Sequence, residues 1–202
     1  MPNLELPLVV LAILAGTLAV TSAGRGAWVA IALLAVTSSA LEFSLADPSH
    51  IGLILRVSAI GIGLIITVPE GLFEPGALRH DLALRTLIAT LRAHPVVVAS
   101  AAAGLLLGLV PLALPIESSS GALRAAGVAL LVVGLPPLLT SRFIEATTRA
   151  AVVTLSGTLL LRTSIFGALD PLAALAIGAG FACILLVGGS VASRIANAEE
   201  EQ

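Results

Sequence analysis

The chain has 202 residues, of which 58% are hydrophobic and 11% are charged, and its formal net charge is −2. A soluble domain has about 25% charged residues, so this composition argues against a water-soluble globular fold. The slight negative charge argues against nucleic acid as a partner. The single cysteine, Cys183, excludes an internal disulfide and a cysteine-based metal cluster.

Seven apolar stretches predict membrane-spanning helices, because a helix that crosses a bilayer needs roughly 20 mostly apolar residues. The first follows a segment that carries Glu5 and no basic residue, so we expect a retained helix and not a cleaved signal peptide. The stretches are apolar on all sides, which favours an all-α integral membrane protein, a single transmembrane domain over 1–202. In chain order they are residues 6–22, 27–46, 51–68, 95–116, 122–140, 144–161 and 172–190.

The distribution of arginine predicts the sidedness of these spans. Seven of the ten arginines fall on one side, two fall on the other, and Arg56 lies within a span. Cytoplasmic loops carry the excess of basic residues, so the N-terminus is predicted to lie outside and the tail, 191–202, in the cytoplasm. Lysine is absent, and alanine and leucine are abundant. This usage is typical of GC-rich bacterial genomes, so the predicted location is a bacterial inner membrane.

The longest polar segment, residues 69–94, lies on the predicted cytoplasmic side. Within it Leu84, Leu87, Ile88 and Leu91 recur at helical spacing, and the arginines lie off that stripe. The pattern predicts a short amphipathic helix on the inner membrane surface. A solvated connector is the alternative.

The order of the spans suggests a parallel 3+1+3 repeat, with three spans in 1–68, a linker span in 95–116 and three spans in 122–190. Asp47-Pro48 precedes the third span and Asp170-Pro171 precedes the seventh, at an offset of 123 residues. At both places Asp is predicted to cap a helix that begins with Pro. Two glycine-rich strings are offset by 117 residues instead, so the two registers conflict.

Two ionisable residues, Glu42 and Arg56, lie within predicted spans. Each is predicted to lie roughly 6–8 Å below the outer surface, from the 1.5 Å rise per helical residue. Adjacent helices would allow the two charges to pair. The pair is predicted either to serve an ion or proton pathway or to be a structural salt bridge, and snorkelling to the headgroups is a further alternative.

No motif for catalysis, nucleotide binding or metal binding is present in the sequence. His50, His80 and His94 lack metal-ligand spacing, and Cys183 lies within the seventh predicted span. We therefore predict neither an enzyme nor a bound cofactor.

Two local patterns bear on how the helices pack. Gly104-x-x-x-Gly108 gives the fourth span a small face suited to close helix contact. Pro136-Pro137 is predicted to break the fifth span, because proline cannot donate the helical hydrogen bond. The break would be either a functional hinge or a static kink that neighbouring helices satisfy.

The layout resembles the component E subunit of hydrogenase-4-type membrane complexes, a family related to the NuoK-like subunits of respiratory complex I. The resemblance lies in span number and loop lengths. It also lies in the third span running into Pro69, the Ser-Arg-Phe-Ile turn at 141–144 and the Ala-Ser-Arg-Ile end at 192–195. It implies a non-catalytic membrane-arm subunit of an ion-translocating redox complex. The family places a glutamate in the sixth span, whereas residues 151–157 hold no carboxylate here, so the resemblance implies scaffolding and not proton conduction at that position.

These observations predict a non-enzymatic subunit of a larger bacterial inner-membrane complex, with the lipid bilayer and other integral membrane subunits as its partners. The alternative is a small solute transporter with parallel 3+1+3 repeats. That layout is similar to the sugar-transporting SWEET group, although the Pro-Gln signature of that group is missing. An integral membrane enzyme is a distant third, because no clustered His, Asp or Ser arrangement is present.

Overall fold

The computed structural model describes residues 2–22, 25–42, 50–67, 84–109 and 120–200. These residues are almost entirely α-helical and contain no strand, which confirms the all-α prediction for this part of the chain. Residues 43–46, 68 and 110–116 of three predicted spans lie outside the described residues. So do Asp47, His80 and the first part of the 69–94 connector.

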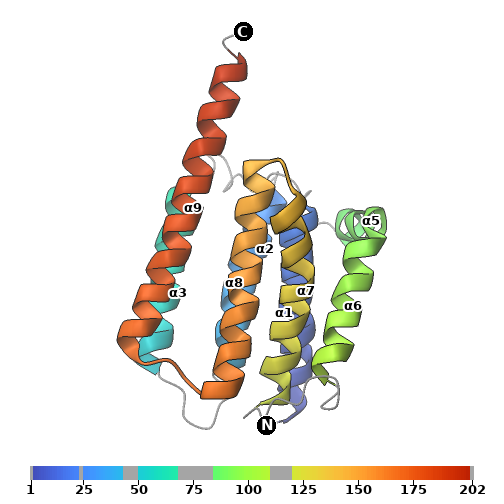
Figure 1. The fold of residues 1–202 in the computed structure, drawn as a ribbon, viewed down its shortest axis with the longest axis vertical. Coiled ribbons are helices and arrows are strands. Elements are labelled where there is room, and N and C mark those ends of the chain that lie inside the picture. The colour runs from blue at the N-terminus through green and yellow to red at the C-terminus, as the bar shows by residue number, and fades with distance from the viewer. Residues whose placement is uncertain (1, 23–24, 43–49, 68–83, 110–119, 201–202) are drawn as a thin grey trace.

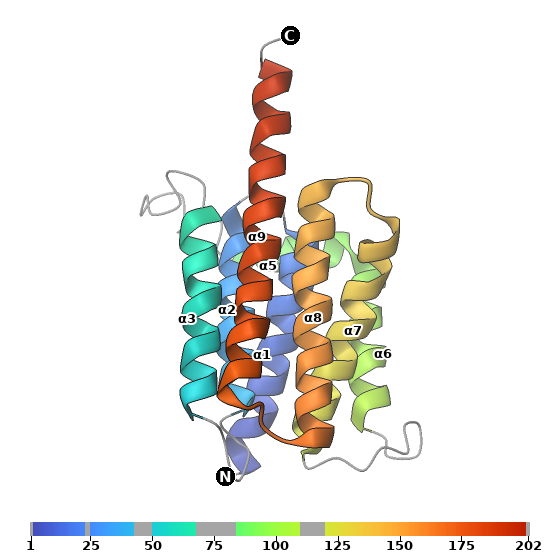
Figure 2. The ribbon, with the colours of Figure 1, turned by 60° about the vertical axis from the view of Figure 1, so that its left-hand side comes forward.

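The helices alternate in direction along one common axis. Figures 1 and 2 show all of them except α5 lying side by side along the long axis of the molecule, each antiparallel to the next. α5 lies across one end of this bundle, where α6 begins. It falls within the 69–94 connector, for which the leucine spacing predicts a short amphipathic helix. The helices are α1 (Pro2–Thr21), α2 (Arg25–Glu42), α3 (His50–Thr67), α5 (Leu84–Ala93), α6 (Pro95–Leu109), α7 (Gly121–Thr140), α8 (Ile144–Phe166) and α9 (Pro171–Glu200).

Four helices, α1, α2, α7 and α8, form the centre of the bundle. α1 packs on α2 and α7, and α8 packs on α7 and α2. Leu34, Leu130 and Leu160 lie in this core and have no exposed surface. α6 covers the outer face of α7, while α3 and α9 form a pair on the opposite side of the bundle (Figure 1).

Helices at corresponding places in the two halves of the chain also touch each other. α1 contacts α7, α2 contacts α8, and α3 contacts α9. The two members of each pair run in the same direction (Figure 2).

Glycines let α6 approach α7 closely. A Cβ placed on Gly104 would lie 2.7 Å from the Cα of Ala129, and one on Gly108 would lie 2.5 Å from the Cα of Ala125. These distances are shorter than any non-bonded carbon contact, so only glycine fits at either position. As predicted, the Gly104-x-x-x-Gly108 face is the face of α6 that packs on its neighbour.

Two helices are long and apolar enough to cross a membrane, judged by length and composition among the described residues. They are α7, over Gly121–Thr140, and the first part of α9, over Pro171–Val191. Shorter apolar helices cover Glu5–Thr21, Gly26–Glu42 and Pro95–Leu109. α8 has 23 residues but is less apolar, because it carries Glu145, Arg149 and Arg162.

The predicted break at Pro136-Pro137 is wrong. α7 continues through both prolines to Thr140, and the Ser141 N–H donates a hydrogen bond of 2.9 Å to the Pro137 carbonyl oxygen. The Thr140 hydroxyl donates to the Pro136 carbonyl oxygen at 2.8 Å. Because the prolines lie close to the end of α7, the helix loses their two N–H groups without losing its last turn.

Candidate functional site

The buried polar side chains gather in the four central helices. Ten polar or charged residues among those described are buried, and each lies in α1, α2, α7 or α8. Within a mainly apolar core, the central helices therefore hold the buried polar groups of the described residues. The residues are Thr17, Thr37, Ser38, Ser39, Glu42, Arg124, Thr148, Ser156, Thr163 and Ser164.

Most of the buried hydroxyls bond within their own helix. Thr17 donates to the Ile13 carbonyl oxygen at 2.8 Å, Ser156 to Val152 at 2.8 Å, and Ser39 to Ala35 at 2.7 Å. A hydroxyl that bonds a carbonyl one turn earlier can be buried without a partner on another helix. These hydroxyls therefore do not by themselves mark a route for ions.

Glu42 is the last residue of α2 and is 4% exposed. Ser38 and Ser39 lie about one turn earlier on the same helix and are also buried. A carboxylate at a helix C-terminus faces the negative end of the helix dipole, so this position disfavours the charge unless a donor compensates it. The predicted pairing with Arg56 stays a prediction, because the side chain of Arg56 lies outside the described residues.

Three arginines donate to backbone carbonyls at helix ends. Arg124 Nε donates to the Gly108 carbonyl oxygen at 2.9 Å, and Arg162 Nη1 donates to the Gly167 carbonyl oxygen at 2.9 Å. Arg149 Nη1 donates to the Ser22 carbonyl oxygen, just beyond α1. Carbonyls at helix C-termini carry partial negative charge and lack helical partners, so a guanidinium is a favourable partner for them.

These bonds join or brace particular helices. Arg124 ties α7 to the end of α6, Arg149 ties α8 to the end of α1, and Arg162 closes the end of its own helix. From the sequence, these arginines enter only the count of charges on each side. The only sign in the sequence of a structural role for these arginines is that they lie inside predicted spans or at span ends.

Asp170 lies at the start of α9 and caps it. Its Oδ1 accepts hydrogen bonds of 2.9 Å from the N–H groups of Leu172 and Ala173. The equivalent prediction for Asp47 lies outside the described residues. The structure thus places Glu42 inside the bundle and Asp170 in an exposed turn, where it serves its own helix.

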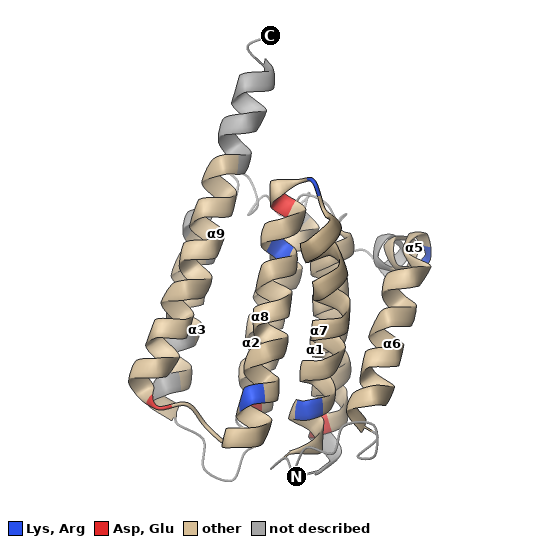
Figure 3. Cartoon of the chain, in the orientation of Figure 1, with Lys and Arg blue, Asp and Glu red and all other residues tan. Residues whose placement is uncertain are grey.

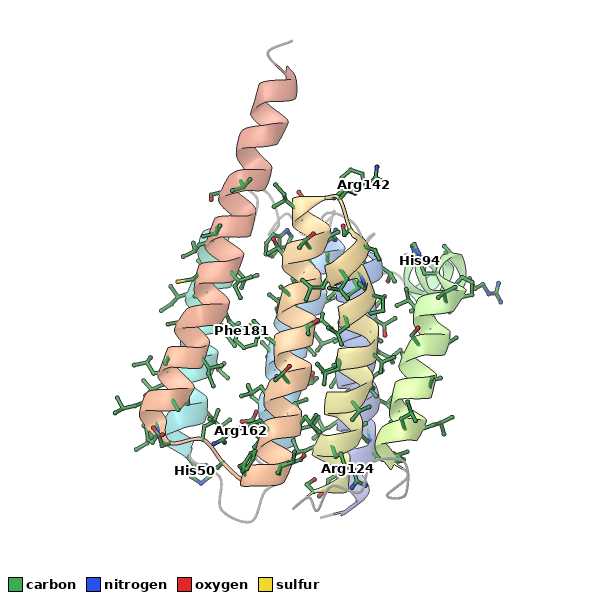
Figure 4. All side chains as sticks on the ribbon, in the orientation of Figure 1. His50, His94, Arg124, Arg142, Arg162 and Phe181 are labelled. Carbon is green, nitrogen blue, oxygen red and sulfur yellow. The ribbon has the colours of Figure 1, made fainter. Side chains whose placement is uncertain are left out.

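A groove lies between α8 and α9. It has a volume of about 330 Å³ and apolar walls, apart from Thr158 and Arg162. Figure 4 shows Phe181 reaching from α9 towards α8, with Arg162 between the two helices near their end. The lining residues are Leu155, Thr158, Leu159, Arg162, Ile177, Gly180, Phe181 and Ile184.

The described residues include no group of three or more His, Cys, Asp or Glu side chains that could hold a metal ion. His50 and His94 are exposed at helix ends, and Cys183 is exposed on α9. No protein-family model matches the chain, and comparisons with curated proteins and with solved structures find no match.

Proposed function

We propose that this chain is a seven-span bacterial inner-membrane protein that acts as a non-catalytic, scaffolding subunit of a larger membrane complex. The spans are α1, α2, α3, α6, α7, α8 and α9, and α5 lies on the cytoplasmic surface. The N-terminus is outside and the C-terminal tail is cytoplasmic.

The observation that carries this proposal is the apolar outer surface of the bundle. Large apolar side chains are exposed on the helices, including Leu6 at 64%, Ile65 at 71% and Leu172 at 79%, while serines, threonines and Glu42 are buried. A water-soluble monomer rarely exposes a contiguous apolar surface of more than a few hundred Å². A bilayer is the solvent that favours this arrangement.

The placement of charge supports the same proposal. Figure 3 shows the charged residues among those coloured gathered towards the two ends of the bundle, with uncharged helix between them. On α8, Arg162 lies thirteen positions after Arg149, or about 20 Å along the helix. Because arginine side chains reach several ångströms towards water, this spacing suits a hydrocarbon core of about 30 Å.

The pairing of corresponding helices supports the parallel 3+1+3 repeat. Contacts of α1 with α7, α2 with α8, and α3 with α9 are those expected if a rotation about the bundle axis relates the two triplets. α6 lies outside this relation, as a linker span would. Parallel repeats related by an axis along the membrane normal are a known plan of membrane proteins.

The subunit role rests on how the bundle is filled. Among the described residues, two small spaces between α2, α8 and α9 have about 10 Å³ each, which is room for about one water molecule. Glycine faces close the contacts between the helices, and apolar side chains cover the outside. An ion-translocating redox complex is the proposed class of assembly, and it rests on the sequence layout resembling the hydrogenase-4 component E family.

A solute transporter with parallel repeats is the second candidate. The same helix pairing favours it, and the groove between α8 and α9 is a space larger than a water molecule. The two candidates differ in whether the chain works with partner subunits or alone.

Membrane insertion is tested first, by cysteine labelling in a Cys183→Ser background. Arg142 lies in the α7–α8 turn and Phe166 ends α8, and both side chains are exposed. An impermeant maleimide should label Phe166→Cys in intact spheroplasts and Arg142→Cys only after permeabilisation. Labelling of both positions from one side would contradict a membrane-spanning α8.

The subunit role is tested by purification from the native host in a mild detergent. We expect a partner of redox or antiporter type to co-purify in stoichiometric amount. A lone protein that moves solute after reconstitution into liposomes would support the transporter and contradict the subunit.

A further inference from the structure

The groove between α8 and α9 exists because α9 packs chiefly on α3 and meets α8 less closely. Gly180 leaves part of it open, since a Cβ placed on Gly180 would meet no heavy atom within 4 Å. This differs from Gly104 and Gly108, which bring α6 and α7 into contact. The glycine at position 180 therefore maintains a space instead of closing a contact.

The groove has one charged end and a long apolar remainder. Arg162 lies at the end nearest the α8–α9 turn, and Leu155 lies seven residues earlier on α8. At 1.5 Å per residue, the groove therefore runs about 10 Å from the arginine towards the middle of the bundle. If the bundle spans a membrane as proposed, Arg162 lies at headgroup level and the apolar walls lie in the hydrocarbon.

Among the residues that the structure describes, Arg162 donates one hydrogen bond to the protein, which leaves further N–H donors for an anion. Its Nη1 donates to the Gly167 carbonyl oxygen at 2.9 Å, and its guanidinium carbon lies 5.9 Å from the centroid of the Phe166 ring. A guanidinium has five N–H donors, and a phosphate accepts two of them in a parallel pair. Asp170, the acid of the adjacent turn, has Oδ1 engaged by the amides of α9.

We propose that this groove binds one acyl chain of an anionic phospholipid, with the lipid phosphate bound by Arg162. The inference rests on the membrane placement proposed above and adds a ligand to it. The cationic end and the apolar walls together favour an anionic lipid, because its phosphate matches Arg162 and its acyl chain matches the rest of the groove.

Native mass spectrometry of the purified full-length protein in detergent tests the proposal. The protein is titrated with phosphatidylglycerol and with diacylglycerol of identical acyl chains, which lacks the phosphate. We expect one retained phosphatidylglycerol, bound about tenfold more tightly than diacylglycerol, since a charge-assisted contact of 1.4 kcal/mol corresponds to tenfold.

Two variants separate the charged end from the apolar walls. Arg162→Gln should remove the preference for phosphatidylglycerol, while Arg142→Gln, which changes an exposed arginine at the other end of α8, should keep it. Gly180→Leu should weaken the binding of both lipids about tenfold, because its side chain would fill the groove. Gly61→Leu is the matched control, because Gly61 also lies in a helix with open space beside it. Thr158→Phe fills the same groove from α8, should Gly180→Leu fail to fold.

Equal binding of the two lipids by the wild-type protein would overturn the proposal. It would also be overturned if Gly180→Leu and Thr158→Phe kept wild-type lipid binding. Loss of a protein partner in these variants, with lipid binding unchanged, would overturn it as well. The membrane placement is tested separately, because maleimide labelling at positions 142 and 166 is measured without added lipid. If the placement is wrong, the expected labelling pattern is not seen, whatever the lipid titration gives.

Discussion

Arg124 Nε donates a hydrogen bond of 2.9 Å to the carbonyl oxygen of Gly108. Arg124 is 7% exposed and lies in the first turn of α7, while Gly108 lies in the last turn of α6. A buried guanidinium thus satisfies a carbonyl that the end of its helix leaves without a partner. The bond ties the outermost helix on that side to the centre of the bundle.

Arg124→Leu should lower the free energy of unfolding by about 2 kcal/mol, because a hydrogen bond to a charged group contributes about 1.5–3 kcal/mol. Thermal unfolding of the detergent-solubilised protein, followed by circular dichroism, measures the loss. Arg142→Leu is the control, since Arg142 is exposed and its replacement should leave the unfolding temperature unchanged. Equal effects of the two replacements would show that the bond to Gly108 does not hold α6.

Alanine at Gly104 or Gly108 should also destabilise the protein. The added Cβ would lie 2.7 Å from the Cα of Ala129 or 2.5 Å from the Cα of Ala125, so α6 must move away from α7. Overpacking of this kind costs about 1–3 kcal/mol, which exceeds the gain of about 1 kcal/mol that alanine brings to a helix interior.

Gly61→Ala is the matched control, and its effect on stability should have the opposite sign. A Cβ at Gly61 would meet no heavy atom within 4 Å, so only the helix-propensity gain of alanine remains. We expect this variant to be more stable than the wild type by up to about 1 kcal/mol. Destabilisation by all three alanines would point to a general need for flexible helices instead of a close α6–α7 contact.

The helical class and the order of the helices could be predicted, because the length of an apolar run is a strong local signal. The face of α6 that packs on α7 could also be predicted, because Gly104 and Gly108 stand four residues apart and so share one side of a helix. The continuity of α7 through Pro136 and Pro137 could not be predicted from the sequence. The effect of a proline depends on its distance from the helix end, and sequence reasoning places that end only to within a few residues.

The arginine contacts could not be predicted from the sequence. Arg149 donates to the Ser22 carbonyl oxygen across 127 positions of the chain, and Arg124 donates to that of Gly108. Every residue has a backbone carbonyl, so such a partner leaves no distinguishing mark in the sequence. The cap at Asp170 is different, because its donors lie two and three residues further along the same chain.

Gly167 should tolerate neither alanine nor asparagine. It follows α8 with φ 79° and ψ −168°, a region that is essentially restricted to glycine and differs from the left-handed helical region that asparagine can adopt. Gly167→Ala and Gly167→Asn should each lower the free energy of unfolding by roughly 1–3 kcal/mol. Both are compared with Ala168→Gly, which changes the neighbouring residue of the same turn. A fully stable Gly167→Asn variant would contradict the backbone conformation described for this turn.

Asp170→Ala should destabilise the start of α9 by about 1 kcal/mol, because two N–H groups would lose their shared acceptor. The groups are those of Leu172 and Ala173, each 2.9 Å from Asp170 Oδ1. Asp170→Asn should restore most of the loss, since its side-chain oxygen can accept the same bonds without the charge. Protection of the Leu172 and Ala173 amides from hydrogen exchange reports the cap directly. It should fall in Asp170→Ala and persist in Asp170→Asn, whereas a loss of protection in both would mean that charge, and not hydrogen bonding, stabilises this helix end.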